Sequence, residues 1–344
     1  MKVLLTGVDG YLGCLAAPYL MERGIEVVGL DTGLYREGWL YPMKGDRPFT
    51  ITKDLRDITA EDLQGFDAVA HLAELSNDPL GQQDPSITYE INHQGSVRLA
   101  DLARKAGVKR FVYTSSCSAY GAAATAESSD FVNEETEPNP QTAYAECKVK
   151  VEQDVSKMAD DDFTVCFLRN ATAFGASPRM RFDIVLNNLT GVAWTTKEIK
   201  LASDGTPWRP MVHALDIAKA IHLSLTAPSE NVQAQIMNVG SNEQNYQIIE
   251  LAKIVANTIP GCELTIGNSD GDNRSYMVNF DKIHRLLPDF KCEWSAERGA
   301  KQLVEMYKSI DMTKEVFEAD PYTRIKELLK LRKNGLLDDK LFWT

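Results

Sequence analysis

A strand-like segment, residues 2–6, runs directly into three glycines spaced three apart, Gly7, Gly10 and Gly13, at the start of an apolar helix. This G-x-x-G-x-x-G pattern constrains the fold more than any other feature of the chain. Gly7 permits a tight turn, Gly10 lets a ligand approach the backbone, and Gly13 lets the helix pack close to the sheet. The helix N-terminus offers free N–H groups and a positive dipole end to phosphates. The pattern therefore predicts a dinucleotide-binding turn between strand and helix.

An acidic residue, Asp31, follows the next strand-like segment, residues 25–30. A carboxylate at this point can accept hydrogen bonds from both hydroxyls of an adenosine ribose, and it would repel a 2′-phosphate. The nearest cation that follows in the sequence is Arg36. We therefore predict that the cofactor is NAD rather than NADP.

The 344 residues carry a formal net charge of −12. This acidity argues against DNA, RNA or an anionic membrane as the main partner, since each favours a basic protein face. Six cysteines are scattered without a C-x-x-C pair, so neither a metal site nor a disulfide framework is expected. The sequence suggests no signal peptide and no apolar run of membrane-spanning length. We expect a cytoplasmic protein.

Apolar strand-like segments alternate with amphipathic helical segments in the first half of the chain. Strands are expected at 2–6, 25–30, 67–72, 109–114 and 163–168, and helices at 11–23, 86–106 and 143–158. This alternation predicts an α/β fold with a Rossmann-type, doubly wound parallel sheet. After residue 175 the pattern changes, with a helix expected around 179–191. We predict a cofactor-binding domain over 1–175 and a smaller mixed α/β substrate domain over 176–344, parts of which return to the first domain.

Tyr144 and Lys148 have the spacing Y-x-x-x-K, which places both side chains on one face of a helix about 5–6 Å apart. A lysine there can lower the pKa of the phenol and can reach a ribose hydroxyl. The spacing alone is common on solvated helix faces. Here it follows a strand that ends in Thr114, Ser115 and Ser116. Three hydroxyl groups at the carboxyl end of a parallel strand are not explained well by packing in the core. Together these residues indicate an acid/base site.

The chain resembles the extended short-chain dehydrogenase/reductases, in the branch of NAD-dependent nucleotide-sugar epimerases and dehydratases. The resemblance covers nearly the whole chain and is most specific in residues 1–175. The matching motifs are Thr6-Gly7-x-x-Gly10-x-x-Gly13, Asp54-Leu55, His71-Leu72-Ala73, Asn92, Ser115-Ser116-x-x-x-Tyr120-Gly121, Tyr144-x-x-x-Lys148, Leu168-Arg169 before Phe174-Gly175, Trp208-Arg209 to His213 with Asp216, and Arg274.

The resemblance implies a role for each matched position. Tyr144 would be the acid/base for a sugar hydroxyl, Lys148 would lower its pKa and hold the nicotinamide ribose, and Ser116 would hydrogen-bond the same sugar oxygen. The implied cofactor-binding residues are Gly7, Gly10, Tyr11, Leu12, Gly13, Asp31, Asp54, Leu55, Leu72, Ala73, Asn92, Tyr144 and Lys148. The implied substrate-binding residues are Ser116, Thr172, Asn187, Arg209 and Arg274. The guanidinium groups of the two arginines suit a nucleotide-sugar diphosphate.

Four positions depart from the pattern of that branch. Its dehydratases carry Asp-Glu directly after the residue that aligns with Ser116, whereas this chain has Cys117 and Ser118, so water elimination lacks its obvious acid/base pair. Many of its epimerases carry an asparagine where this chain has Thr172, which bears on the hydroxyl pattern of the substrate. Glu74 stands where a small residue is common. The sequence leaves open whether Glu74 contacts substrate or is a loop carboxylate.

These observations favour an NAD-dependent nucleotide-sugar epimerase that acts at C4 through a transient 4-keto sugar. One alternative is a nucleotide-sugar C4 dehydrogenase or ketoreductase with net redox change. Another is a dinucleotide-sensing binding protein, against which the intact Ser116, Tyr144 and Lys148 argue. The resemblance also implies a homodimer that pairs through helices 86–106 and 143–158.

Overall fold

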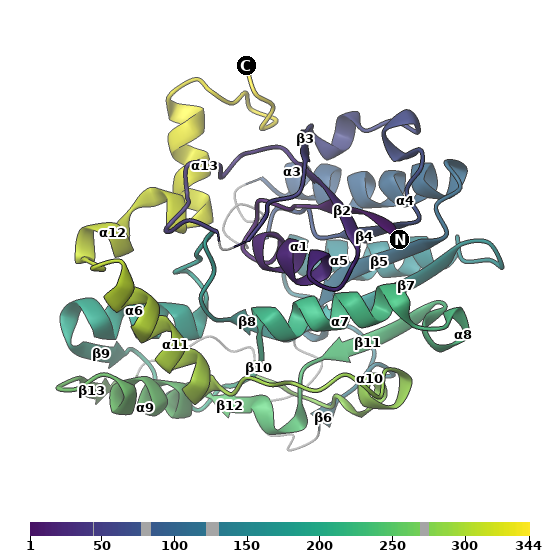
Figure 1. Cartoon of the computed structure of the whole chain (residues 1–344). Helices are drawn as coiled ribbons and strands as arrows, with labels where there is room; N and C mark the ends of the chain where they lie inside the picture. The colour runs from purple at the N-terminus through teal and green to yellow at the C-terminus, as the bar shows by residue number, and fades with distance from the viewer. Residues whose placement is uncertain (44, 77–83, 122–130, 269–274) are drawn as a thin grey trace.

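Seven parallel strands form one sheet through the middle of the molecule (Figure 1). The computed structural model describes residues 1–43, 45–76, 84–121, 131–268 and 275–344. The strand order is β11-β7-β5-β4-β1-β2-β3, built from β1 (Lys2–Thr6), β2 (Glu26–Asp31), β3 (Thr50–Thr52), β4 (Ala68–His71), β5 (Arg110–Ser116), β7 (Thr164–Asn170) and β11 (Gln235–Val239). The chain winds outwards from β1 in both directions, so the sheet reverses its strand order between β1 and β4. Such a switch point is where doubly wound sheets bind ligands.

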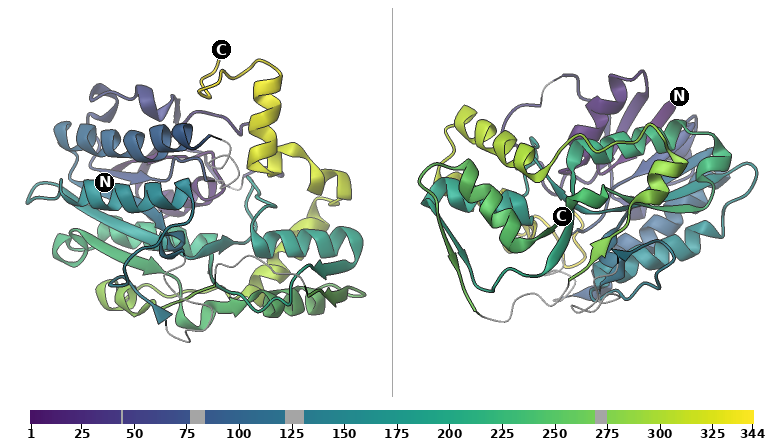
Figure 2. Two further views of the ribbon diagram at one scale, coloured as in Figure 1. Left: turned by 180° about the vertical axis from the view of Figure 1, so that it is seen from behind. Right: turned by 90° about the horizontal axis from the view of Figure 1, so that it is seen from below.

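Helices cover both faces of this sheet because its strands are apolar on both sides. On β1, Val3 and Leu5 enter one hydrophobic cluster and Leu4 enters another on the opposite face. The first cluster is covered by α1 (Gly13–Met21), α7 (Ala214–Thr226) and α10 (Asp281–Leu286), and the second by α4 (Ser96–Lys105) and α5 (Ala143–Ser156). α1 and α7 are in front of the sheet in Figure 1, and α4 and α5 are in front when the molecule is turned round (Figure 2, left).

A smaller mixed region follows β7 and has its own core. It contains a three-stranded sheet of β12 (Asn245–Gln247), β10 (Trp208–His213) and β8 (Thr172–Phe174), and a pair of β13 (Glu263–Ile266) and β9 (Glu198–Leu201). The helices α6 (Val185–Thr196), α9 (Ile248–Thr258) and α11 (Ala296–Ser309) pack together beside these strands. The expected Rossmann-type sheet with a smaller mixed α/β region is confirmed.

The other described α-helices and strands are α3 (Pro85–Thr88), β6 (Phe131–Val132), α8 (Ser229–Val232), β14 (Met277–Val278), α12 (Lys314–Glu318) and α13 (Arg324–Lys333). Within the described residues, we find no helix with both the length and the apolar character needed to cross a bilayer.

Two helix predictions need correction. The helix expected around 179–191 begins only at Val185, because the residues before it form a loop with turns at 178–179 and 182–183. Met180 and Phe182 enter a hydrophobic cluster, whereas Arg179 and Arg181 are directed towards the phosphate-binding turn and the cavity described below. The helix expected over 86–106 is α3, a π-helical stretch Tyr89–Gly95 and α4 in succession.

The C-terminal residues lie beside the residues that follow β2 and β3 (Figure 1). We call residues 324–344 the C-terminal segment. Leu328, Leu331, Leu337 and Leu341 of this segment pack with Leu34, which follows β2. Two hydrogen bonds fasten the end of the segment: the Trp343 indole N–H donates to the carbonyl of Thr32 at 2.7 Å, and Arg56 Nη1 donates to the carbonyl of Lys340 at 2.8 Å.

Candidate active site

A cavity of about 800 Å³ lies at the carboxyl ends of β1, β4 and β5 and continues to the smaller region. Its wall brings together most of the residues expected at the site: Gly7, Gly10, Tyr11, Leu12, Gly13, Asp31, Asp54, Leu55, Leu72, Ala73, Ser116, Tyr144, Lys148, Thr172 and Arg209. These residues come from positions up to about two hundred residues apart in the chain. The cavity spans the switch point of the sheet, so fold and sequence point to the same place.

The glycine turn has the geometry that a dinucleotide requires. Gly7 has a φ of +72°, and a Cβ there would lie 2.9 Å from the backbone nitrogen of Ala73. A Cβ at Gly13 would lie 2.1 Å from the carbonyl oxygen of Gly7, so only glycine lets α1 approach the turn this closely. Asp31 ends β2 on the same wall, where its carboxylate accepts the N–H groups of Gly33 at 2.8 Å and Asp9 at 3.1 Å. These residues fit a bound NAD, with Asp31 held rigidly on the ribose side.

Asp54 and Leu55 extend the wall beyond Asp31. The Asp54 carboxylate accepts hydrogen bonds from the backbone N–H of Arg56 at 2.8 Å and from its Nη2 at 2.8 Å. The same guanidinium stacks 3.6 Å from the ring centroid of Phe342 in the C-terminal segment. Leu341 of the same segment lines the cavity with Asp54 and Leu55, so this part of the wall combines residues that follow β3 with the C-terminal segment.

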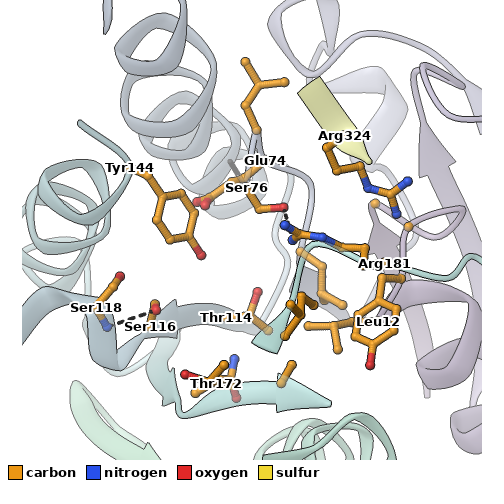
Figure 3. A pocket seen from close by; sticks show the side chains of 18 of the residues that line it. Leu12, Glu74, Ser76, Thr114, Ser116, Ser118, Tyr144, Thr172, Arg181 and Arg324 are labelled. Carbon is orange, nitrogen blue, oxygen red and sulfur yellow. Dashed lines mark hydrogen bonds between the residues drawn. The ribbon is translucent and has the colours of Figure 1, made fainter. Parts of the chain in front are cut away.

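The predicted acid/base side chains face the other half of the cavity. Helix α5 begins directly before Tyr144, where the Thr142 hydroxyl caps it by accepting the N–H of Ala145 at 3.2 Å. Figure 3 shows Tyr144 projecting into the cavity across from Leu12, with Ser116 on the adjoining wall. The Nζ of Lys148 lies 5.3 Å from the ring centroid of Tyr144. A substrate hydroxyl at this point could exchange its proton with the phenol.

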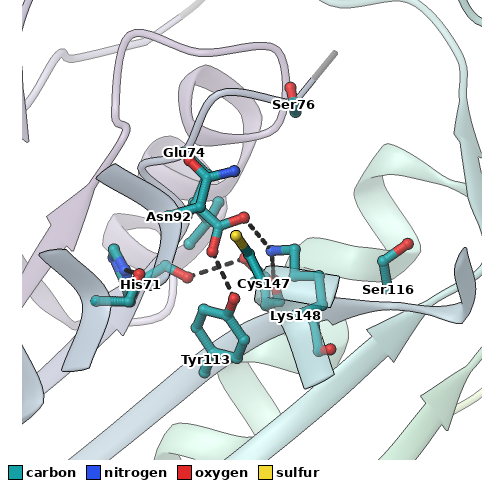
Figure 4. Close-up of polar contacts among 12 residues, drawn as sticks. His71, Glu74, Ser76, Asn92, Tyr113, Ser116, Cys147 and Lys148 are labelled. Carbon is teal, nitrogen blue, oxygen red and sulfur yellow. Dashed lines mark hydrogen bonds and ion pairs between the residues drawn. The ribbon is translucent and has the colours of Figure 1, made fainter. Parts of the chain in front are cut away.

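Glu74 is the nearest counter-ion of Lys148 among the described residues (Figure 4). Its Oε2 lies 2.5 Å from the Nζ of Lys148, and its Oε1 accepts the hydroxyl of Tyr113 at 2.5 Å. Lys148 also donates to the carbonyl of Thr114 at 2.5 Å. Burial opposes the charge on Lys148, but Glu74, Tyr144 and Glu152 together outweigh it, so the pKa of Lys148 is raised. The sequence left the role of Glu74 open, and in the structure Glu74 lines the cavity beside Lys148.

A chain of buried side chains fixes the loop after β4. The hydroxyl oxygen of Thr6 accepts the N–H groups of Leu72 and Ala73, each at 3.1 Å. Its proton is therefore free to reach Nδ1 of His71 at 2.7 Å, which leaves the Nε2 proton to donate to Ser96 at 2.8 Å. Burial lowers the pKa of His71 to about 3, in keeping with a neutral ring. The network holds Leu72 and Ala73 against the cavity.

Two expected site residues support the site from outside the described cavity wall. The Asn187 side chain accepts the N–H of Gly175 at 3.0 Å and donates to the hydroxyl of Tyr11 at 3.2 Å, so it joins α6 to the glycine turn. Its neighbour Asn188 lines the cavity instead. The Asn92 side chain is occupied by the backbone of Leu75, to which it donates at 2.9 Å and from which it accepts at 2.8 Å.

The two arginines expected to bind substrate differ in what the structure describes. Arg209 lines the cavity from β10 and donates to the carbonyl of Trp208 at 2.8 Å. Arg274 lies outside the described residues. Two other arginines of the wall, Arg181 and Arg324, were not expected from the sequence. The sequence signal for Arg181 was its R-x-R spacing with Arg179. We did not use that signal, because a helix was expected around 179–191.

Comparison with known proteins identifies the family. The model of the NAD dependent epimerase/dehydratase family matches residues 3–240. The chain belongs to this family. NAD is accordingly its cofactor, and proteins of the same fold have been solved with NAD bound.

Proteins similar to this chain in sequence or in fold include enzymes of both reaction types. The UDP-glucose 4-epimerase of Bacillus subtilis is 26% identical over 332 residues, which cover 88% of this chain and 94% of the relative. A UDP-glucose-4-epimerase structure from Stenotrophomonas maltophila, with bound NAD and formylated UDP-arabinopyranose, has a TM-score of 0.76 and 25% identity over 90% of this chain and 99% of that chain. An NAD-dependent NDP-hexosamine 5,6-dehydratase of tunicamycin biosynthesis has a TM-score of 0.78 and 23% identity over 90% and 99%. This epimerase/dehydratase chain therefore shares its fold with enzymes of both reactions.

Proposed function

We propose that this protein is a nucleotide-sugar epimerase that inverts C4 of the sugar. The observation that carries the proposal is the position of Ser116, Tyr144 and Lys148 on one wall of a cavity whose other wall fits NAD. The similarity to UDP-glucose 4-epimerases over most of the chain supports the same reaction.

Each side chain has its own task in the proposed reaction. The phenol of Tyr144 takes the proton of the C4 hydroxyl and later returns it, while Ser116 holds the C4 oxygen. Lys148, fixed by Glu74, supplies positive charge that favours the deprotonated phenol. When bound, NAD supplies the acceptor and donor of the C4 hydride, so that a 4-keto sugar forms and is reduced on its opposite face.

The residues after Ser116 favour epimerisation over dehydration. Cys117 is buried and its thiol donates to the carbonyl of Arg169 at 3.2 Å. Burial raises the pKa of this thiol well above its ordinary value, so it is a poor base. Ser118 lines the cavity but carries no ionisable group. The Asp-Glu pair expected of dehydratases in this branch is thus replaced by two residues unsuited to acid/base work.

The smaller region would hold the nucleotide sugar. Thr172, Asn188 and Arg209 reach the cavity from β8, α6 and β10. A guanidinium on this wall suits a diphosphate, and the acidic chain needs such a local cation to attract one.

A panel of UDP-, GDP-, CDP- and dTDP-sugars, followed by NMR, tests the proposal. We expect inversion at C4 without accumulation of NADH, and a loss of about 10²-fold or more in Tyr144→Phe with NAD binding retained. Stoichiometric NADH with a stable keto product would identify a dehydrogenase instead. A product lighter by one water would identify a dehydratase.

We further propose that the enzyme is a homodimer. Helices α4 and α5 pack side by side on one face of the sheet, where the resemblance implies pairing with a second copy. Because α5 carries Tyr144 and Lys148, pairing would brace the catalytic helix. Sedimentation at micromolar concentration should give twice the chain mass, and a fully active monomer would contradict the proposal.

A further inference from the structure

Three arginines gather beside the glycine turn, although the chain as a whole is acidic. Arg179 and Arg181 come from the loop before α6, and Arg324 is the first residue of α13. We call them the arginine cluster. Arg181 pairs with Asp183 through Nη2–Oδ2 at 2.8 Å and Nε–Oδ1 at 3.0 Å. The proposed sugar chemistry uses none of these arginines.

Two arginines of the cluster, Arg179 and Arg324, have buried N–H groups without a hydrogen-bond partner among the described residues. Arg324 is 3% exposed, and its Nη1 has no hydrogen-bond partner among the described residues. Arg179 is fully buried, and both its Nη1 and Nη2 lack a partner among those residues, while its Nε donates to the carbonyl of Asp9 at 2.8 Å. Buried guanidinium donors without acceptors are costly, so this arrangement indicates a place for an anion.

Arg181 and Arg324 face the cavity on the side of the glycine turn. Figure 3 shows Arg181 between Leu12 and Ser76, with Arg324 beside it and Tyr144 on the opposite side. Arg181 Nη1 donates to the hydroxyl of Ser76 at 3.0 Å, so its side chain reaches across to the loop that follows β4. Arg324 stacks on Tyr35, 4.2 Å from its ring centroid, in the loop that follows β2.

The position of these two arginines selects one anion. A dinucleotide bound here has its adenosine beside Asp31 and its nicotinamide half beside Ala73, so its diphosphate must cross between the β2 and β4 loops at the N-terminus of α1. Arg181 and Arg324 lie between those same loops. A substrate diphosphate would instead meet Arg209 on β10.

We propose that Arg181 and Arg324 bind the diphosphate of NAD from the side opposite the glycine turn. The diphosphate is then held between the helix N-terminus and two guanidinium groups. Burial lowers the pKa of Arg324 to about 10, which is consistent with a cation that has too few counter-ions of its own. Arg179, behind the turn, adds positive charge without lining the described cavity.

Isothermal titration of cofactor-free protein tests the proposal with three ligands. Arg181→Gln and Arg324→Gln should each raise the Kd for NAD and for ADP-ribose by about 10–100-fold, as expected for the loss of a charge-assisted bond. The Kd for adenosine, which has no phosphate, should stay within about twofold of the parent value. Arg324→Lys should fall between the parent and Arg324→Gln, because lysine keeps the charge but not the fork.

Arg332→Gln is the matched control, since Arg332 is on the same helix and pairs with the exposed Asp339. It should leave all three Kd values unchanged. UDP, titrated in the same way, distinguishes the substrate site. If Arg181→Gln and Arg324→Gln weaken the binding of UDP but not of ADP-ribose, the two arginines bind substrate and the proposal is wrong. It is also wrong if the binding of adenosine weakens as much as that of NAD, because the loss is then structural. The test does not depend on which sugar reaction the enzyme performs.

Discussion

At the scale of the residue, Glu74 sets the charge that surrounds the proposed acid/base. Besides Glu74, the charged or titratable groups near Lys148 among the described residues are His71 on β4, Tyr113 on β5, and Tyr144, Cys147 and Glu152 on α5. Glu74→Gln removes one negative charge but keeps an acceptor for Tyr113. The charge on Lys148 then favours the deprotonated phenol more strongly, so the acid limb of the pH–rate profile should move to lower pH by about one unit or more.

The matched control for Glu74→Gln is Glu146→Gln, two residues before Lys148 on the same helix. Glu146 accepts a hydrogen bond from Tyr89 instead of pairing with Lys148, so the pH–rate profile should keep its position. An unshifted profile in Glu74→Gln, with parent rates, would mean that Glu74 does not influence the proton transfer.

Single residues of the cofactor site were predictable because their chemistry is local in sequence. Gly7, Gly10 and Gly13 lie within one turn, and Tyr144 and Lys148 lie on one helix face. The pairing of Glu74 was not predictable, because Tyr113 is 39 residues away in the chain. Asn187 was expected in the cavity but is occupied by Tyr11 and Gly175, which only the packed structure brings to it.

At the scale of the element, a buried ion pair fastens α5 to the sheet. Glu152 on α5 receives Arg169 Nη2 of β7 at 2.6 Å and the Ser115 hydroxyl of β5 at 2.5 Å. Glu152→Ala would leave the Arg169 charge buried and unpaired, so the free energy of unfolding should fall by about 3–5 kcal/mol in urea titrations. Asp101→Ala, which breaks the exposed pair with Lys105 on α4, should cost at most about 1 kcal/mol. Equal effects would contradict the bracing role.

The buried ring of His71, the last residue of β4, should make the stability of the fold sensitive to acid. The pKa of His71 is about 3 in the folded protein and about 6.5 in an unfolded chain. Below about pH 6.5 the unfolded state therefore binds a proton that the folded state does not take up until about pH 3. The free energy of unfolding should fall as the pH drops through this interval. His71→Gln should flatten that slope, and an unchanged slope would assign the acid sensitivity to other groups.

Helices and strands were predictable where their apolar residues keep one regular spacing from end to end. The five early strands follow their apolar runs closely. The predicted start of α6 was wrong by six residues, because Met180 and Phe182 are buried side chains of a loop with turns rather than of a helix. The π-helical stretch Tyr89–Gly95 leaves no separate sequence signal, since its apolar residues also suit an α-helix.

At the scale of the whole molecule, the C-terminal segment closes the adenosine side of the cavity. Deletion of residues 336–344 removes Leu341 from the wall and breaks the Trp343–Thr32 and Arg56–Lys340 hydrogen bonds. NAD should then dissociate at least about tenfold faster, as measured by displacement with excess ligand. Trp343→Phe, which loses only one hydrogen bond, should have a smaller effect. A dissociation rate that ignores the deletion would show that the segment does not retain cofactor.

The separation in sequence between the two sides of the cofactor cavity also sets an order for its assembly. The glycine turn is made before Arg324, Leu341 and Trp343, which lie more than 300 residues further along the chain. A domain made from the N-terminus onwards can form most of its sheet during synthesis. It cannot enclose a nucleotide until α13 and the residues that follow it have been made. Retention of the cofactor should therefore begin only after this segment is synthesised, and a chain that lacks the segment should fold its sheet but release NAD more readily.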